Sequence, residues 1–331
     1  MLDERKLQAV WYGGRAPSIG LRALSVLFTM LSGLRRRLYT AGVLPRVRLP
    51  VPVIVVGNIT VGGTGKTPLT IALVEALRER GFRPGVVSRG HGGSAQAPML
   101  LDARTPPQIV GDEACLIRRA THAPTAVGRD RAAAARLLLG QGDVNVVIAD
   151  DGLQHYRLHR DVEICVIDGE RRFGGGRLLP AGPLREPLAR LASVDFRVCN
   201  GGQALADEVA MALQGDEAVS LSDPSRRRAL REFAGQRVHA VAGIGNPQRF
   251  FAQLRALGID IIEHPFPDHH AFVASELVFG DAAPVLMTEK DAVKCAAFAQ
   301  TQWWSVPVRA KLPAQFFDAV AARIANPVRP R

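Results

Sequence analysis

The sequence predicts an α/β fold with two domains of unequal size, and three observations support this prediction. Short apolar strands alternate with helical patterns from about residue 52 onward, which is typical of βαβ units and a largely parallel sheet. A glycine-rich loop at 60–67 lies between the first strand and a helix, as a phosphate-binding loop does. An apolar stretch with basic flanks precedes both features. We therefore expect a P-loop NTPase-like, mostly parallel sheet domain, a second, smaller α/β domain and an N-terminal membrane-associating helix.

The composition is that of a folded globular chain with an excess of positive charge. Its 331 residues suffice for about two domains, and its 47% hydrophobic and 22% charged residues are ordinary for globular proteins. The 42 Lys and Arg residues exceed the 31 Asp and Glu residues by 11. This excess predicts an anionic partner, and nucleic acid, acidic lipid headgroups and phosphorylated substrates all fit it.

The N-terminal segment, 1–48, lacks the pattern of a usual signal peptide. Its uncharged stretch at 23–34 is too short to span a bilayer, and arginines flank it at 22 and 35–37. Such a stretch suits an interfacial helix on an anionic membrane. It suits equally well an ordinary helix packed on the domain core, and the sequence leaves both interpretations open.

The loop at 60–67 is the motif most specific for function. It follows a strand predicted at 53–56 and precedes a helical pattern at 69–77. Backbone N–H groups of such a loop wrap phosphates, a lysine reaches the outer phosphates and a hydroxyl holds Mg²⁺. We expect a nucleotide to bind here through its phosphates, with Lys66 and Thr67 in these two roles. The residues predicted to bind it are Thr60, Val61, Gly62, Gly63, Thr64, Gly65, Lys66 and Thr67. Thr60 occupies the position where the usual pattern has glycine.

The remaining elements follow in order along the chain. A strand at 85–88, a glycine-rich loop at 89–93, an irregular stretch at 94–108, a helix from 112, strands at 144–149 and 163–167, and a Gly/Pro-rich loop at 171–190 complete the first domain. Polar residues at 214–235 indicate a boundary. It would separate a P-loop domain at 49–225 from a smaller α/β domain at 226–331. In the latter we expect strands at 238–242, 259–262, 285–287 and 306–308 and a helix ending at Leu257.

Carboxylates end two of these elements. Asp150 and Asp151 follow the buried strand at 144–149, where an open α/β sheet binds ligands, so a Mg²⁺ site is favoured over a simple turn. Asp112 opens a helix, and its spacing alone favours an N-cap over a base that accepts a hydroxyl proton. His269 could pair with a carboxylate, form part of a metal site or lie in a solvated loop.

Several other patterns indicate no site of their own. The Thr-Glu-Lys-Asp sequence at 288–291 has the wrong spacing for guanine recognition, and the Gly-x-Gly at 243–245 lacks the third glycine of a dinucleotide site. Four single cysteines predict buried, reduced thiols: Cys115, Cys165, Cys199 and Cys295.

Taken together, the motifs resemble the tetraacyldisaccharide 4′-kinase family of lipid A biosynthesis. They appear in the order of that family at 56–68, 88–90, 111–113, 150–155, 179–186, 268–269 and 288–291. The long Gly-Asn…Gly-Lys-Thr-Pro and Asp-Asp-Gly-x-Gln-His strings are specific, and threonine at the position of Thr60 is usual in this family. One departure is the Gly-Gly-Gly at 174–176, where family members often carry Asn between glycines.

The resemblance implies an activity and a location. The chain would use ATP and Mg²⁺ to phosphorylate the 4′-hydroxyl of a tetraacylated glucosamine disaccharide 1-phosphate, forming lipid IVA. It would be a peripheral enzyme on the cytoplasmic face of the inner membrane, with no nucleic acid and no obligate protein as partner. A switch ATPase with a protein or nucleic-acid partner is the alternative, although only 6% of the residues are aromatic and no base-stacking motif is evident.

The resemblance also assigns roles to individual residues. Asp112 becomes the base, His269 its partner, and Lys66 the cation on the phosphates. Thr67, Asp150 and Asp151 become ligands of the metal or of its waters. Arg185, Glu186 and Arg131 become electrostatic contacts in the active site.

Overall fold

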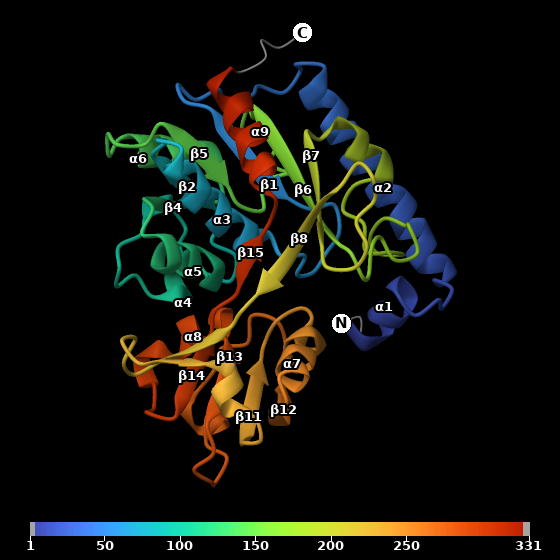
Figure 1. Ribbon diagram of the computed structural model, residues 1–331. Coiled ribbons are helices and arrows are strands. Elements are labelled where there is room, and N and C mark those ends of the chain that lie inside the picture. The colour runs from blue at the N-terminus through green and yellow to red at the C-terminus, as the bar shows by residue number, and fades with distance from the viewer. Residues whose placement is uncertain (1–3, 327–331) are drawn as a thin grey trace.

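The computed structural model describes residues 4–326 and shows two α/β domains, the larger above the smaller in Figure 1. Within these residues, the larger sheet consists of β1 (Val53–Gly57), β2 (Pro84–Ser88), β3 (Met99–Leu100), β4 (Thr125–Val127), β5 (Val146–Ala149), β6 (Val162–Asp168), β7 (Phe196–Asn200), β8 (Val209–Gln214) and β15 (Arg309–Lys311). Their order is β15-β8-β7-β6-β1-β5-β2-β4-β3. The inner pairs are parallel, and antiparallel pairs lie at the two edges, β15 with β8 and β3 with β4.

Helices cover both faces of this sheet, as the continuous apolar strands require. One face packs against α3 (Lys66–Glu79), α5 (Asp112–Thr121) and α9 (Ala314–Ala325), and the other packs against α6 (Arg131–Leu139). A short helix, α4 (Pro107–Val110), precedes α5. Because β1 and β5 are parallel neighbours, the loop after β1 and the acidic residues after β5 lie at the same edge of the sheet.

The smaller domain has its own sheet and its own core. In the part of the chain that the structure describes, its strands are β9 (Glu217–Ser220), β10 (Arg227–Ala229), β11 (Arg237–Ala242), β12 (Asp260–Pro265), β13 (Val285–Thr288) and β14 (Trp303–Val306). They pair in the order β10-β9-β14-β13-β11-β12. Phenylalanines of α7 (Pro247–Ala256) pack on one face, and α8 (Glu289–Cys295) packs on the other.

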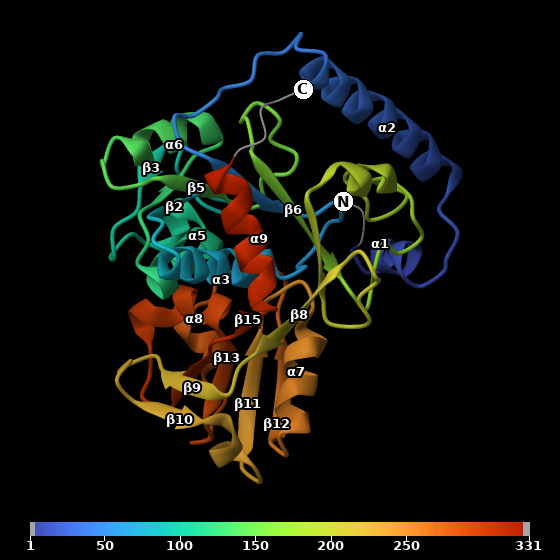
Figure 2. The ribbon, with the colours of Figure 1, turned by 45° about the horizontal axis from the view of Figure 1, so that its top comes forward.

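The sheets divide the chain differently from the predicted boundary at 225. Strand β9 lies before that boundary but pairs with β14 of the smaller sheet. Strand β15 lies after it but pairs with β8 of the larger sheet, and α9 then packs on the larger sheet. The chain therefore passes between the domains twice, at 215–216 and 307–308, and Figure 2 shows α9 back on the larger domain. A single boundary along the sequence cannot describe this exchange of segments.

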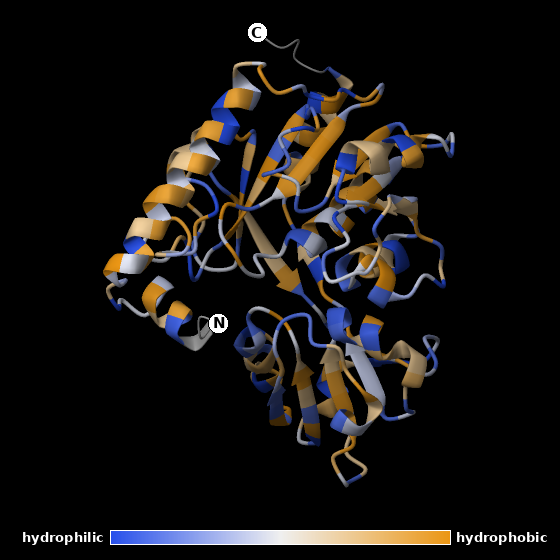
Figure 3. Ribbon diagram, turned by 180° about the vertical axis from the view of Figure 1, so that it is seen from behind, coloured by the Kyte–Doolittle hydropathy of each residue, from blue (hydrophilic) through white to orange (hydrophobic). Residues whose placement is uncertain are grey.

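The N-terminal segment forms α1 (Glu4–Trp11) and α2 (Ile19–Thr40), which lie along one side of the larger domain (Figure 2). Ser25 is the buried residue of α2, and its hydroxyl donates to the carbonyl of Leu178 at 2.8 Å. Large apolar side chains of α2 are instead exposed, namely Ile19, Leu24, Val26, Leu27, Met30, Leu31 and Leu34. Figure 3 shows the corresponding hydrophobic bands along this helix. Its apolar residues are thus not packed into the core, and among residues 4–326 no helix combines the length and apolarity needed to cross a bilayer.

Candidate active site

The phosphate-binding loop connects β1 to α3, as the sequence predicts. Gly62 and Gly65 have φ angles of 103° and 94°, a region that favours glycine. A side chain at Gly65 would also collide with the amide nitrogen of Asn200, 2.4 Å from the position of a Cβ. Asn200 ends β7, and its side-chain amide donates to the carbonyl of Thr64 at 3.0 Å. The loop is therefore braced by a neighbouring strand.

A cavity of about 1720 Å³ extends from this loop to the smaller domain and to α2. The loop contributes residues 62–67 to its lining, and α2 contributes 27–37. The smaller domain contributes, among others, the turn at 244–246, His269 and Lys290. One continuous space thus connects the loop, the second domain and the exposed helix, which is the layout of a site for a nucleotide and a second substrate.

Lys66 and Arg185 meet at Asp151 on one wall of this cavity. The ammonium of Lys66 lies 3.6 Å from Oδ1 of Asp151, and a guanidinium nitrogen of Arg185 lies 3.2 Å from Oδ2. Burial pushes the pKa of Asp151 upward, but the charges of Lys66 and Arg185 outweigh burial and lower the pKa to about 2. Arg131 donates to the main-chain carbonyl of Asp151 at 2.9 Å. The predicted residues Lys66, Asp151, Arg185 and Arg131 are therefore close together.

Asp150 has a different environment, although it is the adjacent residue. It is fully buried, and the hydroxyl of Thr70 donates to its Oδ1 at 3.0 Å. Burial, with the charges of Glu113 and Asp151, raises the pKa of Asp150 to about 7. Its Oδ2 has no hydrogen-bond partner. A buried carboxylate oxygen without a partner is a place where a cation or its water fits.

The residues present fit a magnesium ion bound together with a nucleotide. Among the described residues, no three His, Cys, Asp or Glu side chains gather in the way that an all-protein metal site needs. Mg²⁺ is instead usually held by one or two carboxylates together with substrate phosphates. Asp150, Asp151 and Thr67 supply oxygen donors next to the loop, so they could hold the ion of a Mg-ATP complex.

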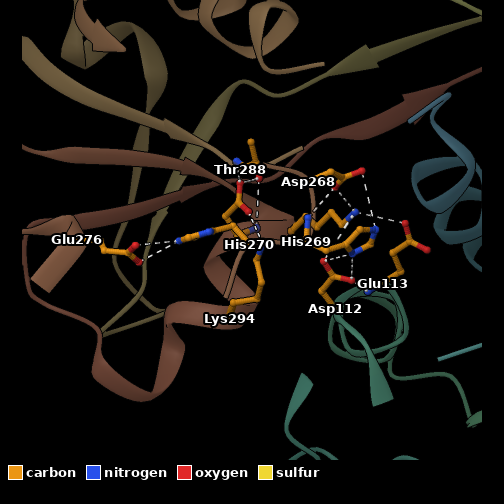
Figure 4. Close-up of polar contacts among 11 residues, drawn as sticks. Asp112, Glu113, Asp268, His269, His270, Glu276, Thr288 and Lys294 are labelled. Carbon is orange, nitrogen blue, oxygen red and sulfur yellow. Dashed lines mark hydrogen bonds and ion pairs between the residues drawn. The ribbon is translucent and has the colours of Figure 1, made fainter. Parts of the chain in front are cut away.

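The second group of polar residues joins the two domains. The Nδ1 atom of His269 lies 3.1 Å from Oδ2 and 3.2 Å from Oδ1 of Asp112 (Figure 4). Asp112 is the first residue of α5, and Gly111 occupies the N-cap position that spacing favoured for Asp112. Burial alone would raise the pKa of Asp112, but the hydrogen bond with His269 and the charge of Lys290 lower it. The same hydrogen bond raises the pKa of His269. The two residues thus form an acid–base pair, of which His269 lines the cavity.

Three predicted site residues have hydrogen-bond partners within the protein that indicate a structural role. Thr60 and Val61 lie at the base of the loop, where Thr60 forms a β-bridge with Leu184 and the amide of Val61 donates to the carbonyl of Pro183 at 2.9 Å. Glu186 also borders the cavity, but its carboxylate accepts hydrogen bonds from Gln154 at 2.8 Å and Tyr156 at 2.6 Å. These contacts hold the segment that carries Arg185.

Sequence reasoning missed two residues of this site. Asn200 braces the loop, as described above, and also accepts from Arg249 of the smaller domain at 3.1 Å. Its position at the end of a buried parallel strand is a signal that could have identified it. Lys290 lies beside Asp112, and it belongs to the 288–291 motif that was set aside as a failed guanine site.

Comparisons with known proteins show which family this chain resembles. Residues 17–325 match the family described as Tetraacyldisaccharide-1-P 4′-kinase. A tetraacyldisaccharide 4′-kinase of Stenotrophomonas maltophilia is 52% identical, with 95% of each chain covered. One from Methylobacillus flagellatus is 50% identical, with 97% of this chain and 96% of that protein covered.

A solved structure is similar over nearly the whole chain as well. The crystal structure of the "apo" form of LpxK from Aquifex aeolicus in complex with ATP superimposes with a TM-score of 0.77 at 27% identity. The match covers 92% of this chain and 96% of that one. On the strength of these matches, the chain belongs to the tetraacyldisaccharide-1-P 4′-kinase family.

Proposed function

We propose that this protein transfers the γ-phosphoryl group of ATP to the 4′-hydroxyl of a tetraacylated glucosamine disaccharide 1-phosphate, a step of lipid A biosynthesis. The observation that carries the proposal is the shared cavity, which has a phosphate-binding loop on one side and an acid–base pair on the other. Family membership supplies the identity of the acceptor. The comparisons do not favour a switch ATPase.

The loop side would bind the nucleotide. Lys66 carries a positive charge beside the loop, and Arg185 adds a second one, so both would neutralise the phosphoryl group during transfer. Mg²⁺ held by Asp150, Asp151 and Thr67 would supply further charge neutralisation on the phosphates. Because phosphoryl transfer depends on positioning and charge, these groups account for most of the expected rate enhancement.

The acid–base pair would prepare the acceptor. We assign to Asp112 the removal of the proton from the 4′-hydroxyl, and to His269 the orientation of the Asp112 carboxylate through the Nδ1 contact. The imidazole also lines the cavity, so the pair lies at the wall of the space for the acceptor. A hydroxyl that loses its proton as it attacks the γ-phosphorus needs such a base nearby.

The lipid part of the acceptor gives α2 a role at the membrane. We propose that α2 lies on the cytoplasmic face of the inner membrane, with exposed side chains such as Val26 and Met30 among the acyl chains. Arginines at 35–37 continue the helix and suit anionic headgroups. Because α2 also lines the cavity, a lipid could place its sugar in the site while its acyl chains stay in the membrane.

The activity is tested by incubating the purified protein with Mg-ATP and the acylated disaccharide in detergent micelles. We expect a product that carries one additional phosphate at the 4′-position. Hydrolysis of ATP without a phosphorylated lipid would support the switch ATPase instead. Binding to nucleic acid that weakens steeply with salt would support a nucleic-acid partner.

The membrane role is tested with two valines that are equally exposed. Val26 of α2 and Val278 of the smaller domain are both 60% exposed. We expect Val26→Asp to weaken sedimentation with anionic phospholipid vesicles by about tenfold, because it removes an apolar side chain that the membrane would bury and adds a charge that anionic headgroups repel. Val278→Asp should leave sedimentation unchanged. Equal behaviour of the two variants would rule out this orientation of α2.

A further inference from the structure

Lys290 places its ammonium among three carboxylates at the junction of the two domains. Figure 4 labels these carboxylates, which belong to Asp112, Glu113 and Asp268. Its Nζ lies 3.0 Å from Oδ1 of Asp268, 3.4 Å from Oε1 of Glu113 and 3.7 Å from Oδ2 of Asp112. Two of these carboxylates belong to α5 of the larger domain, and the third directly precedes His269. Lys290 therefore contacts both elements that carry the acid–base pair.

The position of Lys290 in its helix is unfavourable without these contacts. It is the second residue of α8, where the helix dipole disfavours a cation. Its side chain is only 16% exposed, so burial also opposes the charge. Burial lowers the pKa of Lys290, yet Glu113, Asp112 and Asp268 together raise it above its usual value. The ammonium is thus stabilised by the groups that it connects.

Hydrogen bonds to Asp291 hold the N-terminal end of α8 in the smaller domain. The hydroxyl of Thr288 donates to Oδ2 of Asp291 at 2.6 Å, and the amide of Gly243 donates to the same oxygen at 2.8 Å. Lys294, one turn after Lys290, lies 2.7 Å from Oδ1 of Asp291, within the smaller domain. Asp291 therefore anchors α8 in its own domain through Gly243 and pairs with Lys294 within the helix. Lys290 extends from that anchored helix to the other domain.

We propose that Lys290 is a positioning residue for phosphoryl transfer, which holds Asp112 and the turn at 268–269 together across the domain junction. The proposal rests on the proposed roles of Asp112 and His269. Asp112 has two neighbours from the smaller domain, His269 at 3.1 Å and Lys290 at 3.7 Å. Of these, His269 supplies the directional contact and Lys290 supplies the charge.

The test replaces Lys290 with methionine, which keeps most of its volume and removes the charge. We expect kcat to fall by about tenfold to hundredfold, because the base is less well placed. The KM for Mg-ATP should change little, since the loop is distant in the sequence and separately braced. The acidic limb of the kcat–pH profile should move to higher pH, because Asp112 loses a cation that lowers its pKa. Lys290→Arg should keep the acidic limb where it is in the unaltered protein.

Two controls separate positioning from stability. Lys311→Met removes an exposed charge on β15 and should leave both kcat and the pH profile unchanged. Lys294→Met should lower the melting temperature, because the buried carboxylate of Asp291 loses its counter-ion. It should move the acidic limb less than Lys290→Met does, because the charge of Lys294 is a smaller cause of the lowered pKa of Asp112 than the charge of Lys290. If Lys290→Met folds poorly, Lys290→Gln removes the same charge and keeps a donor for Asp268, and the position of its acidic limb decides the matter.

The results that would overturn the proposal are specific. Unaltered kcat and pH profile in Lys290→Met, with an inactive Asp112→Asn, would remove Lys290 from the mechanism and leave the kinase function intact. Loss of activity in both Lys290 variants with an unmoved acidic limb would assign Lys290 a structural role only. Full turnover by Asp112→Asn would instead contradict the role of the acid–base pair on which the proposal rests.

Discussion

The two sides of the cavity are assembled in different ways. The loop side is local: Lys66 and Thr67 open the helix that follows β1, and Asp150 and Asp151 follow a strand that pairs with β1. The acid–base side is not local, because 157 positions separate Asp112 from His269 and each belongs to a different domain. Binding of the nucleotide therefore depends on one sheet, whereas deprotonation of the acceptor depends on how the domains meet.

Because of this difference, we expect the acid–base side to be more sensitive than the loop side to relative movement of the domains. Contacts within a packed sheet keep their geometry when the domains shift, because the strands and the loop move together. The Asp112–His269 contact would change with any relative movement of the domains. If the domains move, we expect ATP to bind in several arrangements and the phosphoryl group to be transferred only in the one that closes this contact.

Removal of the cation on the loop side should have the largest effect. We expect Lys66→Ala to lower kcat/KM by about a thousandfold or more, since it removes charge neutralisation from the transferred group. Nucleotide binding should weaken as well, because the same ammonium contacts the phosphates in the ground state. Measurement of lipid phosphorylation and of nucleotide affinity checks both expectations. Near-normal turnover would refute the assignment of the loop.

Disruption of the acid–base side should affect turnover but not nucleotide binding. We expect Asp112→Asn to lower kcat by about a hundredfold to ten-thousandfold, with unchanged affinity for ATP, because general-base catalysis contributes on this scale. His269→Ala should cost less, and the double variant should be no worse than Asp112→Asn alone, since the pair acts as a unit. Additive losses would show that the two residues act independently. Steady-state kinetics of the three variants decide between these outcomes.

The same contrast explains what the sequence could and could not predict. The strand, the glycine loop and Lys66 lie within 20 residues of each other, so their spacing alone predicts their geometry. The contact of Asp112 with His269 has no local signal, and only the family resemblance suggested it. Spacing alone favoured an N-cap, because a carboxylate at a helix start has that role in most proteins.

The predicted domain boundary differs from the division into sheets for a related reason. The polar stretch around 214–235 does contain the passage from β8 to β9, but nothing local indicates that β15 and α9 return to the first sheet. The partner of β15 is almost 100 residues earlier in the chain, and its short strand pattern is equally compatible with either sheet. Lys290 was missed because its carboxylate partners come from two distant segments.

Within the loop side, adjacent carboxylates should respond in opposite ways to neutralisation. The pKa of Asp150 is raised to about 7, so the cost of its buried charge to the nucleotide-free protein is complete above pH 7 and fades as the pH falls from 7 towards about 4. The pKa of Asp151 is lowered to about 2, so its charge stabilises the fold above about pH 4 and that contribution disappears as the pH falls towards 2.

We therefore expect Asp150→Asn to raise the melting temperature of the nucleotide-free protein at pH 8 and to raise it less at pH 5. Asp151→Asn should lower the melting temperature at both pH values, because Lys66 and Arg185 lose their shared partner. Both variants should lose activity with Mg-ATP. Thermal melts at the two pH values test the contrast, and a destabilised Asp150→Asn at pH 8 would contradict it.

The smallest effect should come from the irregular first position of the loop. Thr60 is buried and extended, and its bridge to Leu184 is continued by the amide of Arg185, which donates to the carbonyl of Ile59 at 2.7 Å. Glycine would gain nothing there, because the left-handed angles of the loop fall at Gly62 and Gly65. We expect Thr60→Gly to lower the free energy of unfolding by about 1 kcal/mol, since glycine weakens extended structure.

The matched variant Thr60→Val separates the effect of the extended backbone from the effect of the Thr60 hydroxyl. Valine keeps the branched side chain that suits an extended segment but removes the hydroxyl, which lies a long 3.4 Å from the amide of Asn58. We expect its free energy of unfolding and its kcat to stay close to those of the unaltered protein, whereas Thr60→Gly should show a modest loss of kcat because Arg185 is less firmly held. If glycine proves as stable as threonine, the bridge to Leu184 is not what positions Arg185, and even the local side of the site would depend on contacts elsewhere.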